Sequence, residues 1–341
     1  MTDMSRRTFV TRTAAVAGAG LLAPLADRFS SVRAAPALAK RKLGRTGLEL
    51  TLVGFGGARC YQPEIGDEEA AEFLRHFIDR GSNFVETSAN YGANGESEVR
   101  IGLAMKTHRS KVFLETKVDA RDYDGAMREM ERSLKRMNTD RLDLVLHHVL
   151  SNAKQIDQIT AENGAQKAIR KMIDQKAVRF HGFSSHSPSV SLDAITRLDP
   201  DVIQVIVNAT KVPDMEREVL PLAKAKNIGV IGFKSCGAGF FFKTWVSKIK
   251  PTRYDEAPPP PGVLDLPNLP TPSDYLHYTL STPVSTVVIG IDAMKTADLV
   301  IDAALAYKPL SPAEMASMSD RAQVFKTTGY WIPRARPTPG E

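Results

Sequence analysis

The stretch VFLETKVDARDYDGAMREMERSLKRMNTDRLDLVLHH, residues 112–148, decides the fold. Two short runs rich in aliphatic and β-branched residues, 112–116 and 142–147, have the length of buried strands. Between them, residues 123–137 form an amphipathic segment of helix length. A strand, a helix and a second strand in this order predict two parallel strands joined by a crossover helix.

The same alternation continues along the chain. We expect strands at 52–55, 83–86, 112–116, 142–147, 178–183, 202–205, 229–233 and 286–290, and helices at 67–80, 97–105, 123–137, 161–174, 188–198, 215–226, 273–282 and 296–306. Eight strand–helix units predict a parallel sheet, and eight is the number that closes a (β/α)8 TIM barrel. An open doubly wound sheet is the alternative, but GFGGARC at 54–60 lacks the glycine spacing that such a fold places after its first strand.

Three segments lie outside the repeating units. KRKLGRTGLELTLVGFGG, residues 40–57, predicts an N-terminal β-hairpin, turned at 44–47, that caps the bottom of the barrel. The proline-rich residues 251–272 follow the seventh strand, so we expect an extended loop on the active-site face. A disordered insert without a role is the alternative. The barrel is expected to span 40–325, with a surface tail at 326–341.

The first 39 residues have the pattern of a twin-arginine export signal. Arg6 and Arg7 precede a stretch rich in alanine and glycine at 13–26, and small-residue cleavage sites follow that end at Ala34 and Ala39. An amphipathic helix packed on the body is the alternative. We therefore expect a periplasmic or secreted protein that has the twin-arginine translocation machinery as a partner.

Charge and composition exclude several classes of protein. The formal net charge is +6, and removal of the five arginines and two aspartates of residues 1–39 lowers it to +3, so no nucleic-acid partner is indicated. No apolar run reaches the roughly 18 residues of a spanning helix, so no stable membrane insertion is expected. The two cysteines, Cys60 and Cys236, are too few for an iron–sulfur cluster or a four-thiolate zinc site, and whether they pair is left open.

Polar side chains gather at the C-terminal ends of adjacent expected strands, where barrels keep functional groups. The second strand ends at Glu86 with Tyr91 in the loop behind it, the third ends near Lys117, and the fourth ends at His147 and His148. A nearby ammonium lowers the pKa of a phenol below its free value of about 10, and a carboxylate holds that ammonium in place and charged. These groups predict a proton-transfer site. A plain ion pair between Glu86 and Lys117 is the alternative.

These residues lie in motifs that together resemble the aldo-keto reductase superfamily along nearly the whole chain after residue 39. The motifs are LGRTGLELTLVGFGG, FVETSANYG with the later SE, FLETKV, RLDLVLHH, VRFHGFSSH, VIQVIVN and STVVIGI. The resemblance implies a (β/α)8 barrel that reduces carbonyls with NADPH through a Tyr, Lys, Asp and His tetrad. It assigns the tetrad to Tyr91, Lys117, His148 and Glu86, with glutamate where the family has aspartate.

The resemblance also implies a nicotinamide cofactor site at the ends of the later strands. It assigns the nicotinamide amide to Ser184, Ser185 and Gln204, the ring stacking to Phe233, the pyrophosphate to Lys234 and Ser235, and the adenosine end to the segment with Gly290, Asp292 and Lys295. NADP is expected on family grounds. NAD is the alternative, because an acid such as Asp292 can bind a free ribose hydroxyl.

The sequence therefore predicts an NAD(P)H-dependent oxidoreductase that reduces an aldehyde or ketone to an alcohol, or the reverse, with Tyr91 as the proton donor. The expected partner is a small carbonyl or alcohol substrate. A cofactor-binding sensor or scaffold with weak or no turnover is the alternative, because Glu86 departs from the family aspartate. A metal-dependent lyase or epimerase is disfavoured and no metal is expected, since His181 and His186 have no further ligands at metal-binding spacing.

Overall fold

The structure, a computed structural model, describes residues 37–237, 262 and 265–327. Residues 1–36 of the expected export signal lie outside the described residues, as do most of the proline-rich loop at 251–272 and the tail from residue 328 onward. The described residues fall within one unit of the chain, Ala37–Glu341.

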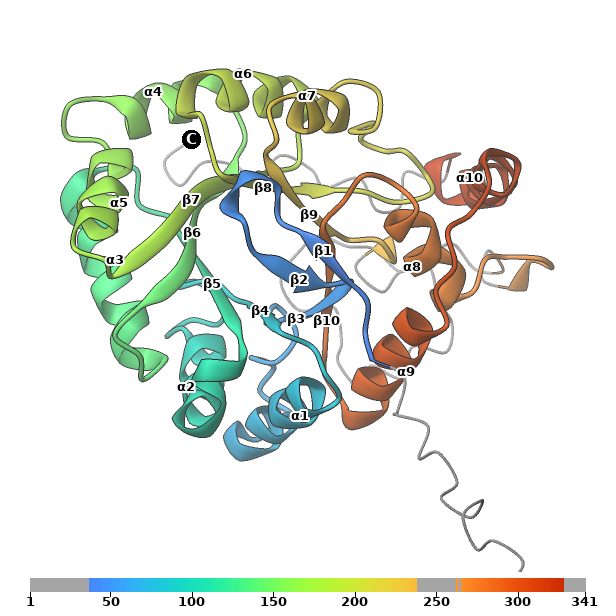
Figure 1. The fold of residues 1–341 in the computed structure, drawn as a ribbon, viewed down its shortest axis with the longest axis horizontal. Helices are drawn as coiled ribbons and strands as arrows, with labels where there is room; N and C mark the ends of the chain where they lie inside the picture. The colour runs from blue at the N-terminus through green and yellow to red at the C-terminus, as the bar shows by residue number, and fades with distance from the viewer. Residues whose placement is uncertain (1–36, 238–261, 263–264, 328–341) are drawn as a thin grey trace, which may run out of the picture. The chain divides into compact units, whose positions relative to one another are not determined.

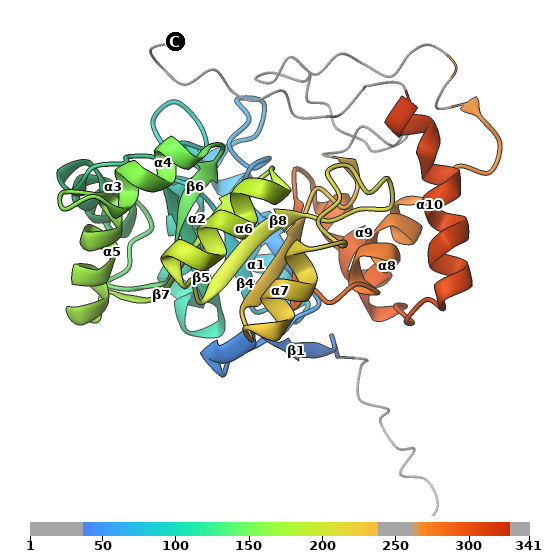
Figure 2. The same cartoon turned by 90° about the horizontal axis from the view of Figure 1, so that it is seen from above.

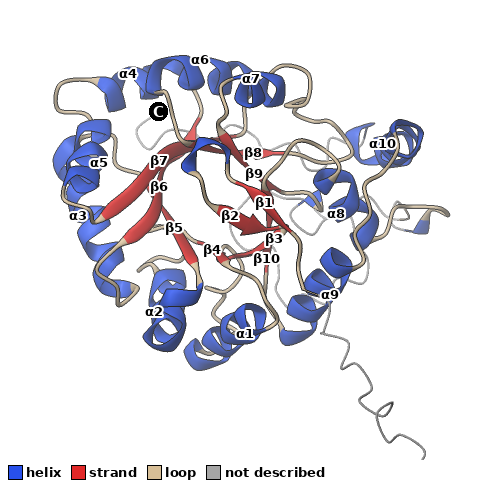
Figure 3. Cartoon of the chain, viewed as in Figure 1, coloured by secondary structure: helices blue, strands red, loops and turns tan. Residues whose placement is uncertain are grey.

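Eight parallel strands close into a barrel, as Figures 1 and 3 show. They are β3 (Val53–Gly56), β4 (Phe84–Glu86), β5 (Phe113–Val118), β6 (Leu142–Leu150), β7 (Val178–Ser185), β8 (Val202–Ile206), β9 (Gly229–Phe233) and β10 (Thr286–Gly290). They follow one another around the barrel in chain order, and β10 pairs with β3 to close it. The predicted (β/α)8 barrel is confirmed, and the open doubly wound alternative is wrong.

Helices cover the outside of the barrel between successive strands (Figure 1). Those that overlap the expected helices are α1 (Asp67–Asp79), α2 (Glu96–His108), α3 (Tyr123–Arg136), α5 (Ala165–Asp174), α6 (Pro188–Leu198), α7 (Val219–Ala225), α8 (Pro272–Leu280) and α9 (Met294–Leu305). Local capping fixes several of their starts. At α6, Ser187 accepts a hydrogen bond from Val190 N and Pro188 occupies the first turn, which is the usual arrangement at a helix N-terminus.

Helix α4 (Ala153–Thr160) lies outside the expected set. It begins after Asn152, whose side chain accepts a hydrogen bond from Gln155 N, and it buries only Ile156 and Ile159. Two apolar contacts are too few for a periodic signal in the sequence. The backbone is extended at Ala161, so the helix expected from that residue starts only at α5.

Helix α10 (Pro312–Thr327) was also not expected, although it buries Met318, Ala322 and Phe325 at helical spacing. Its final residues belong to the segment that the sequence assigns to a surface tail. Two short 3-10 helices, η2 (Gly44–Thr46) and η3 (Arg109–Lys111), complete the described elements.

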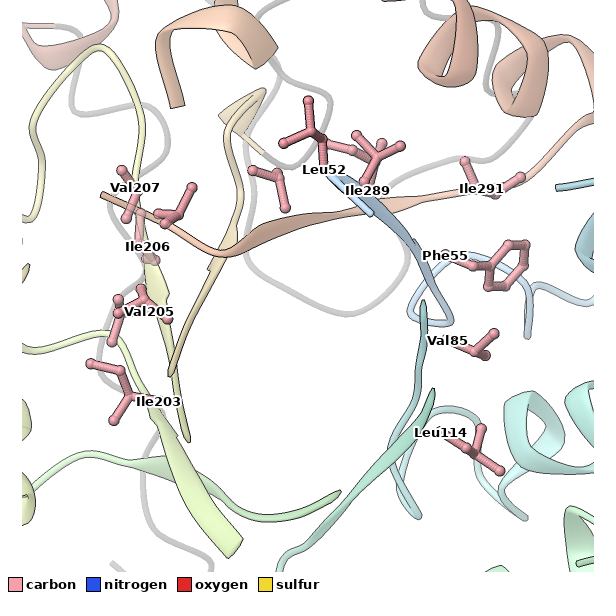
Figure 4. Packing of buried hydrophobic residues seen from close by; sticks show 14 of the residues in the cluster. Leu52, Phe55, Val85, Leu114, Ile203, Val205, Ile206, Val207, Ile289 and Ile291 are labelled. Carbon is pink, nitrogen blue, oxygen red and sulfur yellow. The ribbon is translucent and has the colours of Figure 1, made fainter. Parts of the chain in front are cut away.

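Alternate residues of each barrel strand point outward to the helices and inward to the barrel axis. Figure 4 shows outward-facing apolar side chains, among them Phe55, Val85 and Leu114, which belong to the main core. Inward-facing apolar residues form a separate cluster, here called the apolar floor, made of Phe84, Phe113, Leu144, Leu146, Val202, Ile231 and Val288. Beyond it, toward the C-terminal ends of the strands, the inward residues become polar and buried: Glu86, Glu115, Lys117, Ser184 and Gln204. We call this set the polar layer.

The N-terminal hairpin consists of β1 (Lys40–Lys42) and β2 (Glu49–Thr51), which pair antiparallel and lie below the barrel in Figure 2. Leu43 and Leu50 of this hairpin pack against the apolar floor. The turn requires glycine at residue 44, because its φ is +50° and a Cβ there would overlap the backbone at the start of β9. The predicted hairpin is therefore present at the N-terminal end of the barrel.

The barrel unit includes the last residues of the segment assigned to the export signal. Leu38 is buried in the main core, and the carbonyl oxygen of Ala39 accepts a hydrogen bond from Leu52 N at 3.0 Å. A boundary at residue 39 therefore cuts into packed structure, whereas a boundary at Ala34, the earlier of the two expected sites, would leave these contacts intact.

Candidate active site

Glu86, the last residue of β4, is the centre of the polar layer. Its Oε1 accepts hydrogen bonds from Lys117 Nζ, from Tyr91 Oη at 3.1 Å and from Gln204 Nε2 at 3.4 Å, and its Oε2 accepts one from Gly57 N at 3.2 Å. The side chain is only 3% exposed, so these bonds act in a poorly solvated environment, where charge-assisted bonds are strong. Glutamate has one methylene more than the aspartate expected here. Its longer side chain lets one carboxylate oxygen bind the Tyr91 hydroxyl while the other binds Gly57 N in the β3–α1 loop.

Lys117, on β5, has two carboxylate neighbours. Its ammonium donates to Glu86 Oε1 and to the carbonyl oxygen of Thr87 at 2.8 Å, and it lies 3.2 Å from Glu115 Oε1. Burial alone would lower the pKa of Lys117, but the attraction of Glu86 and Glu115 outweighs it and raises that pKa above its ordinary value. Lys117 is therefore a fixed positive charge at neutral pH.

The Tyr91 ring is held between cationic and aromatic neighbours. Lys117 Nζ lies 5.2 Å from the ring centroid, and the ring of Tyr61 stacks on Tyr91 with centroids 6.4 Å apart. The ring of His148 meets Tyr91 edge to face at 5.8 Å. The Tyr91 phenol thus lies beside an ammonium and donates its hydrogen bond to a carboxylate. These are the surroundings that a proton donor requires.

An irregularity in β6 sets the position of His148. The pairing of β6 with β7 shifts register between His147 and Leu150, and Val149 has a φ of +46°, a strained value for a β-branched residue. Ser184 Oγ stabilises this backbone by accepting a hydrogen bond from Val149 N at 2.8 Å. His148, immediately before this bend, faces Tyr91.

The side chain of His148 is also oriented by its ring nitrogen Nδ1. This atom lies 3.0 Å from Asp119 Oδ1 and 3.3 Å from Ser88 Oγ. A carboxylate only accepts hydrogen bonds, so Nδ1 carries the hydrogen and Nε2 of the neutral ring is an acceptor. His148 therefore donates from Nε2 to a substrate oxygen only when the ring is doubly protonated.

The neighbouring His147 has a different environment. Its Nε2 lies 2.7 Å from Gln166 Oε1, and Gln166 Nε2 in turn lies 3.3 Å from His181 Nδ1. Burial, with further repulsion from Arg121 and His181, lowers the pKa of His147 to about 3. His147 is thus a neutral structural residue of β6 that contacts α5 through Gln166, and the geometry favours His148 for the site, as the sequence motif does.

Two of the proposed cofactor residues, Ser184 and Gln204, face the barrel interior. Gln204 is bonded to Glu86 through Nε2, and its buried Oε1 has no hydrogen-bond partner among the described residues. A buried acceptor without a partner is costly. A carboxamide N–H is the kind of donor that would satisfy it, so this residue fits the amide of a nicotinamide.

Ser185, in contrast, is not brought to the polar layer. Its hydroxyl donates to the carbonyl oxygen of Leu150 at 2.7 Å and accepts from Ser187 N at 3.1 Å. As the next residue after Ser184, its side chain points to the other side of the sheet. The geometry therefore gives Ser185 a role in tying β7 to β6, which differs from the cofactor contact that the resemblance implies.

The residues at the end of β9 lie next along the barrel rim. The ring of Phe233 packs against the ring of His186 with centroids 5.4 Å apart. Lys234 has a φ of +55°, and its carbonyl oxygen accepts a hydrogen bond from Asn208 Nδ2 at 3.1 Å. Ser235 is fully buried, with Oγ 3.6 Å from Cys236 Sγ, so its hydroxyl faces the protein.

Gly290, Asp292 and Lys295 lie at the end of β10 and the start of α9. A Cβ at Gly290 would lie 2.6 Å from Cγ of Arg59, so glycine makes room for that arginine. Asp292 Oδ1 accepts a hydrogen bond from Thr296 Oγ1 at 2.9 Å, and Lys295 is exposed. The expected cofactor residues, apart from Ser185 and the inward-turned hydroxyl of Ser235, thus lie along an arc from β7 to the start of α9, beside the proton-transfer residues of β4 to β6.

Both cysteines are buried free thiols. Burial raises the pKa of Cys60 to about 11 and that of Cys236 to about 12, so neither is a thiolate at neutral pH. Within residues 37–237, 262 and 265–327, no group of three or more His, Cys, Asp or Glu side chains is placed to hold a metal ion. No helix in the same part of the chain is long and apolar enough to cross a membrane.

The sequence model of the Aldo/keto reductase family matches residues 52–320. This chain belongs to the aldo/keto reductase family. It is similar to a probable aldo-keto reductase from Glycine max, with 27% identity over 62% of this chain and 63% of that protein. It is also similar to L-galactose dehydrogenase from Arabidopsis thaliana, with 27% identity over 58% of this chain and 66% of that protein. The matches thus span about two thirds of these curated relatives.

Solved aldo-keto reductases share the fold of this family member. The holo form of an aldo-keto reductase from Bacillus halodurans superposes with a TM-score of 0.67 at 22% identity, covering 89% of this chain and 99% of that one. An aldo/keto reductase from Klebsiella pneumoniae, solved in complex with NADP and acetate, superposes with a TM-score of 0.63 at 18% identity, covering 88% and 98%.

Two acids of the site in this aldo/keto reductase, Glu115 and Asp119, were not predicted from the sequence. Glu115 lies two residues before Lys117 on one strand, so strand periodicity alone puts both side chains on the same face. That signal was present in FLETKV. Asp119 follows the strand in a loop, and its contact with His148 depends on loop geometry that the sequence pattern does not contain.

Proposed function

We propose that this aldo/keto reductase transfers hydride between a nicotinamide cofactor and the carbonyl carbon of a small aldehyde or ketone, with Tyr91 as the proton donor. The observation that supports this function best is the meeting of the Tyr91 hydroxyl and the Lys117 ammonium at one oxygen of Glu86. A phenol and an ammonium on one carboxylate form a proton-transfer unit at the active-site end of the barrel.

In the direction of reduction, the bound cofactor supplies the hydride. Tyr91 turns its hydroxyl from Glu86 to the substrate oxygen and gives up its proton. The phenolate that remains is stabilised by the Lys117 ammonium, which Glu86 holds in place. His148, held at Nδ1 by Asp119, donates from Nε2 to the substrate oxygen when its ring is doubly protonated and so positions that oxygen beside Tyr91. The reverse sequence oxidises an alcohol, with the phenolate as base.

The expected cofactor is NADP. Gln204 Oε1 would accept a hydrogen bond from the carboxamide, with Ser184 beside it on β7, and Phe233 would contact the nicotinamide ring. Lys295, exposed at the first turn of α9, is available to a 2′-phosphate. Asp292 is engaged with Thr296, which makes it less suited to a free ribose hydroxyl. The Klebsiella pneumoniae relative, solved with NADP, supports the same preference.

Nicotinamide titration tests this function. Adding NADPH or NADH to the protein should give a saturable fluorescence change for both, with the lower Kd for NADPH because of Lys295. A panel of aldehydes and ketones should then oxidise NADPH at a rate that depends on the protein. If neither nucleotide gives a saturable change, the cofactor proposal is wrong. Binding without turnover of any carbonyl would favour the alternative function.

The alternative function is a sensor or scaffold that binds the cofactor with weak or no turnover. The observation behind it is Glu86 in place of the family aspartate. In this alternative, the hydrogen bond from Tyr91 to Glu86 stores the phenol proton in an unproductive position. The two functions differ in what they predict for the Glu86→Asp variant.

We also propose that the protein is exported by the twin-arginine machinery to the periplasm or beyond it, carrying its cofactor, because that machinery moves folded cargo. Cleavage after Ala34 is favoured, since Leu38 and Ala39 take part in the packed barrel. Amino-terminal sequencing of the periplasmic protein should then begin at Ala35, and mass spectrometry of the same sample should detect a bound nicotinamide. Unprocessed protein confined to the cytoplasm would contradict export, and processed protein without a nucleotide would contradict carriage.

A further inference from the structure

Glu115 is a second carboxyl group in the polar layer, and no function has yet been assigned to it. Its Cα pairs with that of Glu86 across β4 and β5, so the two glutamates lie side by side and face the interior. The side chain is fully buried, and Oε1 lies 3.2 Å from Lys117 Nζ. Lys117 thus stands between two carboxyl groups and carries the charge to balance only one.

The surroundings of Glu115 provide little else to stabilise a negative charge. Lys117 on its own strand and Glu86 on β4 are the charged groups that act on it. On the other side, β6 presents Leu144 and Leu146 of the apolar floor, and they pair in register with Glu115 and Lys117. Within the described part of the chain, neither carboxyl oxygen of Glu115 has a partner in hydrogen-bond geometry. An ionised carboxylate in such a place is costly.

We propose that Glu115 is a positioning residue of the proton-transfer site, which holds a proton at neutral pH and sets the charge balance of Lys117 and Glu86 around Tyr91. The proposal rests on the proposed function for its meaning, but its geometry does not depend on turnover. While Glu115 is neutral, the ammonium of Lys117 is matched by Glu86 alone. Ionisation of Glu115 gives the cluster an excess negative charge, which opposes formation of the Tyr91 phenolate.

The proton on Glu115 follows from its burial. Burial raises its pKa from 4.5 to about 8; Lys117 opposes this rise and Glu86 adds to it. The consequence for stability has a definite sign. The unfolded carboxyl loses its proton near its ordinary pKa and the folded one near pH 8, so the free energy of unfolding decreases as the pH rises between these values. Glutamine at position 115 removes that dependence while keeping the shape.

The test uses the alkaline ultraviolet titration of tyrosinate in the full-length protein. Each background is compared with its own Tyr91→Phe derivative, so that the difference reports Tyr91 alone. In Glu115→Gln, we expect the Tyr91 midpoint to lie about one pH unit lower than in the wild type, because the negative charge that Glu115 gains above pH 8 is absent. The Glu115→Asp variant keeps a titrating carboxyl and should retain a midpoint nearer the wild-type value.

Glu216→Gln is the matched control. Glu216 is a partly buried acid whose pKa is raised by burial, and it accepts a hydrogen bond from Tyr278, away from the polar layer. It should leave the Tyr91 midpoint unchanged. An equal midpoint in wild type and Glu115→Gln would overturn the positioning role.

Urea unfolding between pH 5 and pH 8 provides the second measurement. The wild type should lose stability relative to Glu115→Gln as the pH rises, and equal slopes would show that Glu115 is ionised throughout and overturn the proposal. Neither measurement requires a substrate. Absence of carbonyl turnover therefore counts against the proposed function, whereas an unmoved titration counts against Glu115.

Discussion

Replacing Tyr91 with phenylalanine is expected to reduce kcat for carbonyl reduction by about 10²- to 10⁴-fold, which is the usual contribution of a positioned proton donor. The variant loses one hydroxyl, which donates to Glu86 at 3.1 Å. The ring contacts with Tyr61 and His148 do not need that hydroxyl. Nucleotide affinity should therefore stay close to that of the wild type, because the proposed cofactor residues lie on the β7 to β10 arc.

The Tyr123→Phe variant is the matched control for loss of a phenolic hydroxyl. Tyr123 starts α3 outside the barrel, where Lys171 Nζ lies 5.7 Å from its ring. Its kcat should equal that of the wild type. Steady-state kinetics and nucleotide titration of the three proteins measure the effect. If Tyr91→Phe turned over carbonyls at the wild-type rate, Tyr91 would not be the proton donor.

The fold was readable from the sequence because each strand buries its outward face under helices and therefore contains an apolar run. The limits of the strands were less readable at their C-terminal ends. There β6 runs on to Leu150 and β7 to Ser185, beyond the apolar residues. These last residues lie in the polar layer or just beyond it, so their amino-acid composition resembles that of a loop. Their backbone is nevertheless paired between β6 and β7.

The site was only partly predictable for a related reason. Glu86, Tyr91 and Lys117 follow strands at fixed spacing, and the structure brings them into contact. The bend that turns His148 toward Tyr91 depends on the left-handed backbone conformation of Val149. Valine rarely adopts this conformation, so the sequence does not indicate the bend. The opposite orientations of Ser184 and Ser185 follow from strand periodicity, but only if the strand is known to extend through both.

The Glu86→Asp variant should distinguish a working enzyme from a cofactor-binding sensor. Glu86 spans two anchors, with Oε2 on Gly57 N and Oε1 on Tyr91 Oη and Lys117 Nζ. Aspartate is one methylene shorter and reaches only one of these anchors. If the wild-type site is that of a working enzyme, the Glu86→Asp variant holds Tyr91 and Lys117 less firmly in place. The loss of one charge-assisted hydrogen bond, about 1.5–3 kcal/mol, should then lower kcat by roughly 10- to 100-fold.

The opposite result has an equally definite physical meaning. If Glu86 traps the Tyr91 proton, shortening the side chain releases the hydroxyl and leaves the ammonium of Lys117 as its main charged neighbour, so kcat rises. The Glu86→Gln variant controls for length, because it keeps the reach of Glu86 and removes its charge. The Glu86→Gln variant should have a lower kcat than the wild type whether the protein is an enzyme or a sensor. Glu115 is then the acidic side chain that remains beside Lys117, and the electrostatic field around Tyr91 changes. A gain in kcat specific to Glu86→Asp would therefore favour the sensor, and a loss would favour an enzyme whose proton-transfer geometry is built on glutamate.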